Sequence, residues 1–178
     1  FYGYADKEFS FAHNGVLYND VELRKENHLP DTHIETDSYV AVQLIEAQKK
    51  LDFDSLKNMA EAVRGNFTFT ALDVENSLYI IKGSNPMYLL HFEMLGLYVY
   101  ASTESIMKNA LRKVNMLSFL YTRIETAHGD IIKIDKNGFV IINGNKTKEF
   151  WDGRIRCENK PLRLKIRNIC GDETVWEV

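Results

Sequence analysis

The stretch that decides the fold runs from Asn66 to Tyr100 and reads NFTFTALDVENSLYIIKGSNPMYLLHFEMLGLYVY. It contains short runs of β-branched and aromatic residues separated by turn residues, a pattern typical of strands. The runs cover residues 66–72, 78–81, 88–92 and 97–100. Several of them are apolar on both faces, which predicts a sheet that is covered on each side.

Helical periodicity flanks this block of strands. It predicts helices at residues 21–25, 39–47, 56–63 and 103–111. The third helix is expected to end at Arg64-Gly65, where glycine can take the left-handed cap conformation. A first strand is expected at residues 9–13 and a closing hairpin within residues 129–142. Because helices and strands come in blocks rather than in alternation, this order favours an α+β fold over a doubly wound sheet.

Composition is that of one ordinary folded domain: 178 residues, 45% hydrophobic and 26% charged. We expect one domain over residues 1–150, followed by a tail, residues 151–178, of uncertain packing. A net charge of -3 excludes a strongly basic nucleic-acid-binding protein. There is no signal peptide and no apolar run of about 18 residues, so we expect no membrane association and a cytoplasmic location.

Residues that could carry metal or nucleophilic chemistry are few. The five histidines show no i, i+4 ligand spacing, so no metal site is expected. His28 and His33 are interpreted as surface residues. Cys157 and Cys170 are interpreted as buried or idle thiols, although nearby Lys and Arg could lower a thiol pKa. No phosphate-binding glycine loop and no GxSxG elbow occurs.

Two polar segments remain. Residues 12–15 (Ala-His-Asn-Gly) leave the first predicted strand, and residues 34–37 (Ile-Glu-Thr-Asp) open the helix at 39–47. Taken singly, the first indicates a hairpin turn with residues 16–18 as its return strand, and the second indicates a helix cap. Their order and their combination favour a functional site instead.

Residues 13–19 (HNGVLYN), with Glu22-Leu23 and Glu35-Thr36-Asp37, resemble the glutaminase domain of class II glutamine amidotransferases, which are N-terminal-nucleophile hydrolases. The resemblance runs in the family's order from residue 9 to about 142. It continues through Arg64-Gly65-Asn66-Phe67, Lys82-Gly83-Ser84-Asn85-Pro86-Met87-Tyr88, Tyr100-Ala101-Ser102-Thr103-Glu104 and His128-Gly129-Asp130-Ile131. The Glu-Thr-Asp segment is closer to the glucosamine-6-phosphate synthase type than to asparagine synthetase, which usually has Ser-Asp there.

This resemblance implies a four-layer αββα sandwich, L-glutamine as the substrate, no cofactor, and a synthase domain or subunit that accepts ammonia. Glutamine amide hydrolysis passes through a tetrahedral oxyanion and a thioester. By resemblance, Asn14 and Gly15 would form the oxyanion hole. Asp37 would pair with the α-ammonium of glutamine, a contact that selects a free amino acid.

One departure from the family concerns the nucleophile. The family uses an N-terminal cysteine with its own α-amino group as base, followed by an Arg-containing segment that binds the glutamine carboxylate. The sequence begins at Phe1, with 12 residues before His13. We therefore expect a fragment that lacks the first few dozen residues of the domain and is inactive as given. The alternatives are a non-catalytic amidotransferase-like interaction domain, or the glutaminase half of an asparagine synthetase or purine-pathway amidotransferase.

Overall fold

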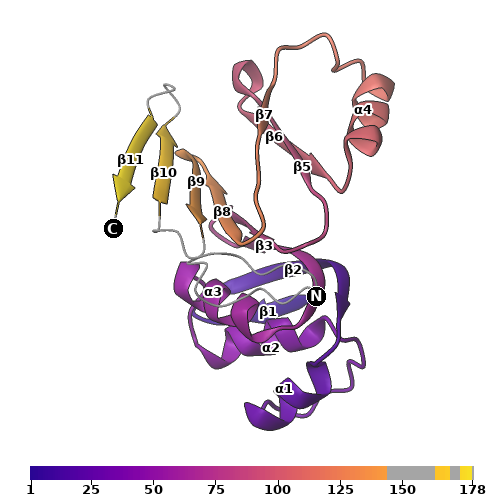
Figure 1. Ribbon diagram of the computed structural model, residues 1–178, viewed down its shortest axis with the longest axis vertical. Coiled ribbons are helices and arrows are strands. Elements are labelled where there is room, and N and C mark those ends of the chain that lie inside the picture. Colours follow the sequence, from indigo (N-terminus) through magenta and orange to yellow (C-terminus); the bar gives the residue numbers. More distant parts are fainter. Residues whose placement is uncertain (144–162, 169–172, 178) are drawn as a thin grey trace.

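The computed structural model describes residues 1–143, 163–168 and 173–177, with side chains up to residue 139 (Figure 1). The helices are α1 (Asp20–Glu26), α2 (Tyr39–Ala47), α3 (Phe53–Ala62) and α4 (Glu104–Lys113), with a 3₁₀ turn η1 at Glu93–Leu95. The strands are β1 (Tyr2–Tyr4), β2 (Glu8–Leu17), β3 (Gly65–Asp73), β4 (Leu78–Lys82), β5 (Tyr88–Phe92), β6 (Leu97–Ala101), β7 (Thr122–Ile124), β8 (Asp130–Asp135), β9 (Gly138–Asn143), β10 (Arg163–Asn168) and β11 (Glu173–Glu177).

The described strands form two antiparallel sheets. The large sheet has eight strands in the order β1-β2-β3-β4-β8-β9-β10-β11, and the small sheet has three in the order β6-β5-β7. The longest pairing joins β2 to β3 from Phe9↔Asp73 to Leu17↔Gly65. β4 pairs with β8 rather than with β5, so the chain leaves the large sheet after β4 and returns to it at β8.

The helices α2 and α3 pack on one face of the large sheet. The hydrophobic cluster between these helices and the sheet includes Phe67 and Phe69 of β3, Ile81 of β4, Ile45 of α2 and Leu56 of α3, all at most 1% exposed. Burial of this apolar area is the main stabilising contribution to this half of the molecule. Figure 1 shows the helices α1–α3 gathered on the side of β1 and β2.

The other face of the large sheet packs on the small sheet. Ile80 and Ile132, from β4 and β8, meet Leu89 of β5 and Ile124 of β7. Because side chains alternate between the faces of a strand, Ile80 faces the small sheet while its neighbour Ile81 faces the helices.

The helix α4 covers the outer face of the small sheet. Leu90 and Phe92 of β5 pack against Met107 and Leu111 of α4. Thr103 caps this helix, accepting a hydrogen bond from the Ile106 amide at 3.3 Å. The resulting order is helices, large sheet, small sheet, helix, which confirms the expected α+β fold and its four-layer αββα arrangement (Figure 1).

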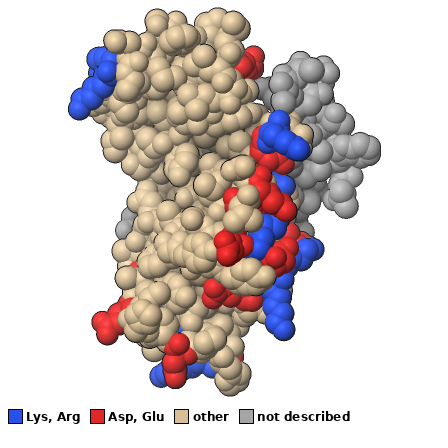
Figure 2. All heavy atoms as spheres, turned by 180° about the vertical axis from the view of Figure 1, so that it is seen from behind, with Lys and Arg blue, Asp and Glu red and all other residues tan. Residues whose placement is uncertain are grey.

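Charged side chains are unevenly distributed on the face seen from behind. They gather along one side edge of that face and at its lower end, whereas the middle and the upper part away from that edge are mostly uncharged (Figure 2).

Two local expectations are wrong. The Asn14-Gly15 pair makes no hairpin turn, because β2 continues through it to Leu17 and every residue from Phe9 to Leu17 has a partner on β3. Gly65 is no left-handed helix cap either. The helix α3 ends at Ala62, and Gly65 begins β3 with φ +155°, where an added Cβ would lie 2.1 Å from the Val16 carbonyl oxygen.

Three-residue strands β1 and β7 are absent from the sequence-based expectations, whereas the helices at 39–47 and 103–111 and the closing hairpin are confirmed. In the segment predicted as a tail, β10 pairs with β9 and β11 pairs with β10. The domain boundary near residue 150 stays a prediction. Cys157 and Cys170 lie outside the described residues.

Candidate functional site

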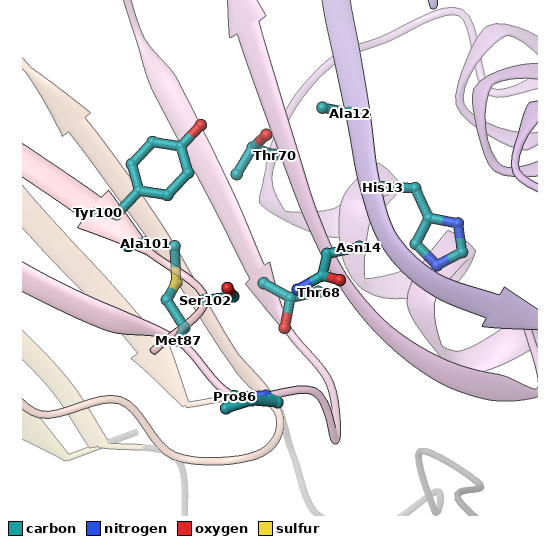
Figure 3. A pocket seen from close by; sticks show the side chains of 10 residues that line it. All are labelled: Ala12, His13, Asn14, Thr68, Thr70, Pro86, Met87, Tyr100, Ala101 and Ser102. Carbon is teal, nitrogen blue, oxygen red and sulfur yellow. The ribbon is translucent and has the colours of Figure 1, made fainter. Parts of the chain in front are cut away.

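A cavity of about 300 Å³ lies where the two sheets face each other beside β2 and β3 (Figure 3). Its lining comes from both sheets and the loops next to them: Ala12, His13, Asn14, Thr68, Thr70, Pro86, Met87, Tyr100, Ala101 and Ser102. Isoleucine fills the space between the sheets at β4 and β8. At β2 and β3 the facing side chains are too short to do so, and a cavity remains.

Asn14 projects from β2 into this cavity, near Thr68 of β3 (Figure 3). Its backbone is held by Asn85, whose side-chain amide donates to the Asn14 carbonyl at 2.6 Å. The Asn85 carbonyl in turn accepts from Thr68 Oγ1 at 2.9 Å. No hydrogen bond engages the Asn14 side-chain amide within the described part of the chain, so it is available to a ligand.

Gly15 follows Asn14 at a position that excludes any side chain. Its φ is +148°, and an added Cβ would lie 1.8 Å from the Asn66 carbonyl oxygen of β3 and 2.8 Å from His13 Nε2. Glycine is therefore required for β2 to run this close to β3. It also leaves room for the His13 ring.

Asp37 precedes α2 and bonds to the end of β2. Its Oδ2 accepts a hydrogen bond from the Leu17 amide at 2.5 Å, and its Oδ1 accepts one from Ser38 Oγ at 3.2 Å. The residue at the N-cap position of α2 is Ser38, and no side chain caps that helix end. The helix-cap interpretation of the Glu-Thr-Asp segment is therefore wrong, because the Asp37 carboxylate is directed at β2.

His13 lies between β2 and the start of α2. Its ring points away from the other cavity residues (Figure 3), and its Nδ1 lies 2.7 Å from Ser38 Oγ. The ring packs on Phe69 with the ring centroids 4.6 Å apart. Burial lowers the pKa of His13 from its ordinary 6.5, while the Asp37 carboxylate and the Asn66 carbonyl act in the opposite direction.

A buried lysine fixes the loop that carries Asn85. Lys82 ends β4, and its Nζ donates to the Gly83 carbonyl at 2.6 Å. Its own carbonyl accepts from the Gly129 amide at 2.7 Å, which joins the loop after β4 to the start of β8. Burial lowers the pKa of the Lys82 ammonium, and the Asp130 carboxylate opposes this shift. Segments that lie far apart in the sequence thus meet beside the cavity.

The predicted site residues are therefore only partly brought together. Asn14 lines the cavity, Gly15 follows it on the same strand, and Asp37 bonds to Leu17 at the end of that strand. The sequence-based interpretation missed the contacts of Ser38 and Asn85. Both residues stand inside motifs quoted for the family resemblance or directly beside them, but no local pattern specifies their partners.

In the described ranges, no three His, Cys, Asp or Glu side chains lie close enough together to hold a metal ion. His28 and His33 are exposed, as expected. Within the same ranges, no helix is both long enough and apolar enough to cross a bilayer.

Comparison with known proteins settles the family. The sequence model described as "Glutamine amidotransferase domain" matches residues 1–109. The chain belongs to the glutamine amidotransferase domain family. This membership confirms the class II assignment made from the motifs, and the N-terminal-nucleophile hydrolase fold agrees with the layers described above.

Curated relatives match part of this amidotransferase domain. Glutamine--fructose-6-phosphate aminotransferase [isomerizing] of Bacillus thuringiensis subsp. konkukian is 34% identical over 88 residues, covering 46% of this chain and 14% of that protein. 7-cyano-7-deazaguanine synthase 2 of Sulfurisphaera tokodaii is 28% identical over 101 residues, covering 55% of this chain and 22% of that protein. The match thus spans less than a quarter of either relative.

Solved structures share the fold of this amidotransferase domain. The allosteric regulatory enzyme of purine biosynthesis superposes with a TM-score of 0.61 at 21% identity, over 78% of this chain and 29% of that chain. Glutamine phosphoribosylpyrophosphate amidotransferase from B. subtilis superposes with a TM-score of 0.59, also at 21% identity, over 78% of this chain and 30% of that one.

Proposed function

We propose that this amidotransferase domain hydrolyses L-glutamine to glutamate and ammonia. The proposal rests chiefly on Asn14. Its side-chain amide has no hydrogen-bond partner in the described part of the chain and projects into the cavity between the sheets, and it precedes a glycine whose position leaves no space for a Cβ. A side-chain amide and a neighbouring backbone N–H can direct two donors at one developing oxyanion.

The reaction would proceed through a thioester. By family resemblance, an N-terminal cysteine thiol attacks the amide carbon, and its proton passes by way of the α-amino group to the leaving nitrogen. Ammonia departs and the thioester remains; water then adds to the thioester carbon, releasing glutamate and restoring the thiol. Each addition places negative charge on the former amide oxygen, where Asn14 Nδ2 and the Gly15 N–H would donate.

Asp37 would bind the α-ammonium of glutamine. Each carboxylate oxygen accepts one hydrogen bond from the protein, and each has a further lone pair for a substrate N–H. A charge-assisted contact of this kind favours a free amino acid over a simple amide. The cavity that Asn14 lines, and that Asp37 does not, has a volume of about 300 Å³, at the small end of ligand sites.

Ammonia would pass to an acceptor domain or subunit. In support, the residues matched here make up 14% of the aminotransferase and 22% of the deazaguanine synthase named above. Both names describe reactions that differ from glutamine hydrolysis alone, so the acceptor chemistry would reside in other parts of those proteins. The cytoplasmic location stays a prediction.

Release of ammonia and glutamate from L-glutamine tests this function. The protein should be produced as its gene encodes it, with any sequence that precedes Phe1, and L-asparagine serves as the control substrate. We expect equal amounts of glutamate and ammonia from glutamine.

Two other outcomes are informative. If the encoded protein binds L-glutamine but does not hydrolyse it, the non-catalytic interaction domain is the correct alternative. If it neither binds nor hydrolyses glutamine, the proposed function is wrong.

A further inference from the structure

A hydrogen-bonded network joins His13 of β2 to the carboxylate before α2. His13 Nδ1 lies 2.7 Å from Ser38 Oγ, and Ser38 Oγ lies 3.2 Å from Asp37 Oδ1. Asp37 Oδ2 then accepts from the Leu17 amide, which returns the network to β2. The two segments that carry the family motifs are tied together through one serine hydroxyl.

The direction of the protons depends on the tautomer of His13. A serine hydroxyl has one proton, and an ionised carboxylate can only accept. With His13 Nδ1 protonated, the Ser38 oxygen accepts from His13 and the Ser38 proton is directed at Asp37.

Packing holds the network in one arrangement. Ser38 is 9% exposed, and the His13 ring packs on Phe69. On the other side, Gly15 leaves the space beside His13 Nε2 open, since an added Cβ would lie 2.8 Å from that atom. The Asp37 carboxylate receives one hydrogen bond from each of two elements, so neither oxygen can turn freely.

We propose that His13 and Ser38 are positioning residues that hold the Asp37 carboxylate in the orientation that binds the α-ammonium of glutamine. This inference rests on the proposed function and deepens it. Neither residue touches the reacting amide in this account. Their effect is to fix the carboxylate before the substrate arrives, so that less ordering is required on binding.

A merely structural tether between β2 and α2 would give a different result from a positioning network. Loss of a tether lowers stability and leaves the affinity for glutamine unchanged. Loss of positioning raises the KM for glutamine with little change in kcat, because the α-ammonium contact is the same in the ground state and the transition state. Loss of positioning also raises the KM only while the Asp37 carboxylate is present.

The test is a double-mutant cycle in the protein as its gene encodes it, with glutamine hydrolysis as the assay. We expect Ser38→Ala to raise KM by about 5- to 20-fold, the effect of one hydrogen bond to a charged group, with kcat unchanged. Ser38→Thr, which keeps the hydroxyl, should restore KM. In the Asp37→Ala background, Ser38→Ala should have no further effect.

Ser55→Ala is the matched control. Ser55 is a buried serine near the start of α3, where its hydroxyl accepts from the Asp52 amide at 3.0 Å, so its loss should lower stability without changing KM. If Ser38→Ala does not fold, His13→Ala breaks the network from the other end and should raise KM in the same way.

Three results separate the possible failures. An encoded protein that releases no ammonia contradicts the proposed function itself. In an active protein, an unchanged KM in Ser38→Ala and His13→Ala overturns the positioning role alone. So does a rise in KM that persists undiminished in the Asp37→Ala background.

Discussion

The negative charge of Asp37 is required for the proposed contact with the α-ammonium of glutamine. Asp37→Asn keeps an oxygen that can accept from the Leu17 amide but loses the negative charge that would face an α-ammonium. We expect KM for glutamine to rise by about 10- to 100-fold, with kcat changed little. Steady-state kinetics with Asp54→Asn, an exposed carboxylate on α3, as the control would measure this. An unchanged KM would remove Asp37 from the binding site.

His13 makes stability depend on pH. Burial holds its pKa below the 6.5 of the unfolded chain, so the unfolded state takes up a proton first as the solution is acidified. This contribution is complete above pH 6.5 and is lost as pH falls through the lower, folded-state pKa. Burial also lowers the pKa of His91, which acts in the same direction.

The free energy of unfolding, measured by urea titration at pH 7.5 and 5.5, should therefore fall on acidification. His13→Gln should show a smaller fall than the wild type, and His91→Gln offers a comparison at a site distant in sequence. Equal falls in the wild type and in His13→Gln would contradict the burial effect at this histidine.

Single residues of the site differ in how far sequence could specify them. Asn14, Gly15 and Asp37 stand in motifs whose chemistry is legible from residue type, and their expected roles remain predictions. The role of Ser38 depends on a hydroxyl that contacts a histidine 25 positions away. Such a contact is decided by how α2 packs on β2, which no local pattern encodes.

Among the elements, the pairing of β2 with β3 depends on one glycine. Gly15→Ala would place a Cβ against the Asn66 carbonyl and force a side chain into φ +148°. We expect the free energy of unfolding to fall by roughly 2–5 kcal/mol, the sum of strain and overpacking. Denaturant unfolding of this variant would measure the loss.

Gly96→Ala is the control for conformation alone. Gly96 has φ +57° and open space around the position of an added Cβ, so its substitution should cost only about 1–2 kcal/mol. Equal losses in the two variants would mean that the close approach of β2 to β3 is not what requires glycine at position 15.

The same strand shows why local turn signals can fail. Asn-Gly is favoured in tight hairpins, but nine consecutive residues of β2 pair with β3, and this ladder overrides the local preference. Helices with a clear apolar periodicity, such as α2 and α4, could be predicted because their buried faces follow from spacing. Strands of three residues, such as β1 and β7, are too short to show a period.

For the whole molecule, contact between the two sheets is the defining feature. Ile80→Ala removes a fully buried side chain between them and should lower the free energy of unfolding by about 2–5 kcal/mol. Leu72→Ala, on a side chain that is 47% exposed, should cost no more than about 0.5 kcal/mol. Thermal or denaturant unfolding would compare them, and similar small losses would contradict the layered arrangement.

Block order in the sequence predicted the α+β class, but it could not assign strands to sheets. β4 and β5 are neighbours in the chain and lie in different sheets, because β4 pairs with β8. Which edges meet is decided by long-range packing of residues such as Ile80 and Leu89. The cavity follows from that packing and is equally invisible to local patterns.

Stabilisation of an oxyanion by Asn14 is the central claim, and the turnover number for glutamine hydrolysis tests it most directly. In the protein as its gene encodes it, Asn14→Ala should lower kcat by about 100- to 1000-fold while KM and the melting temperature change little. Asn109→Ala, an exposed asparagine on α4, should behave as the wild type. A folded Asn14→Ala protein that hydrolyses glutamine at the wild-type rate would contradict the account.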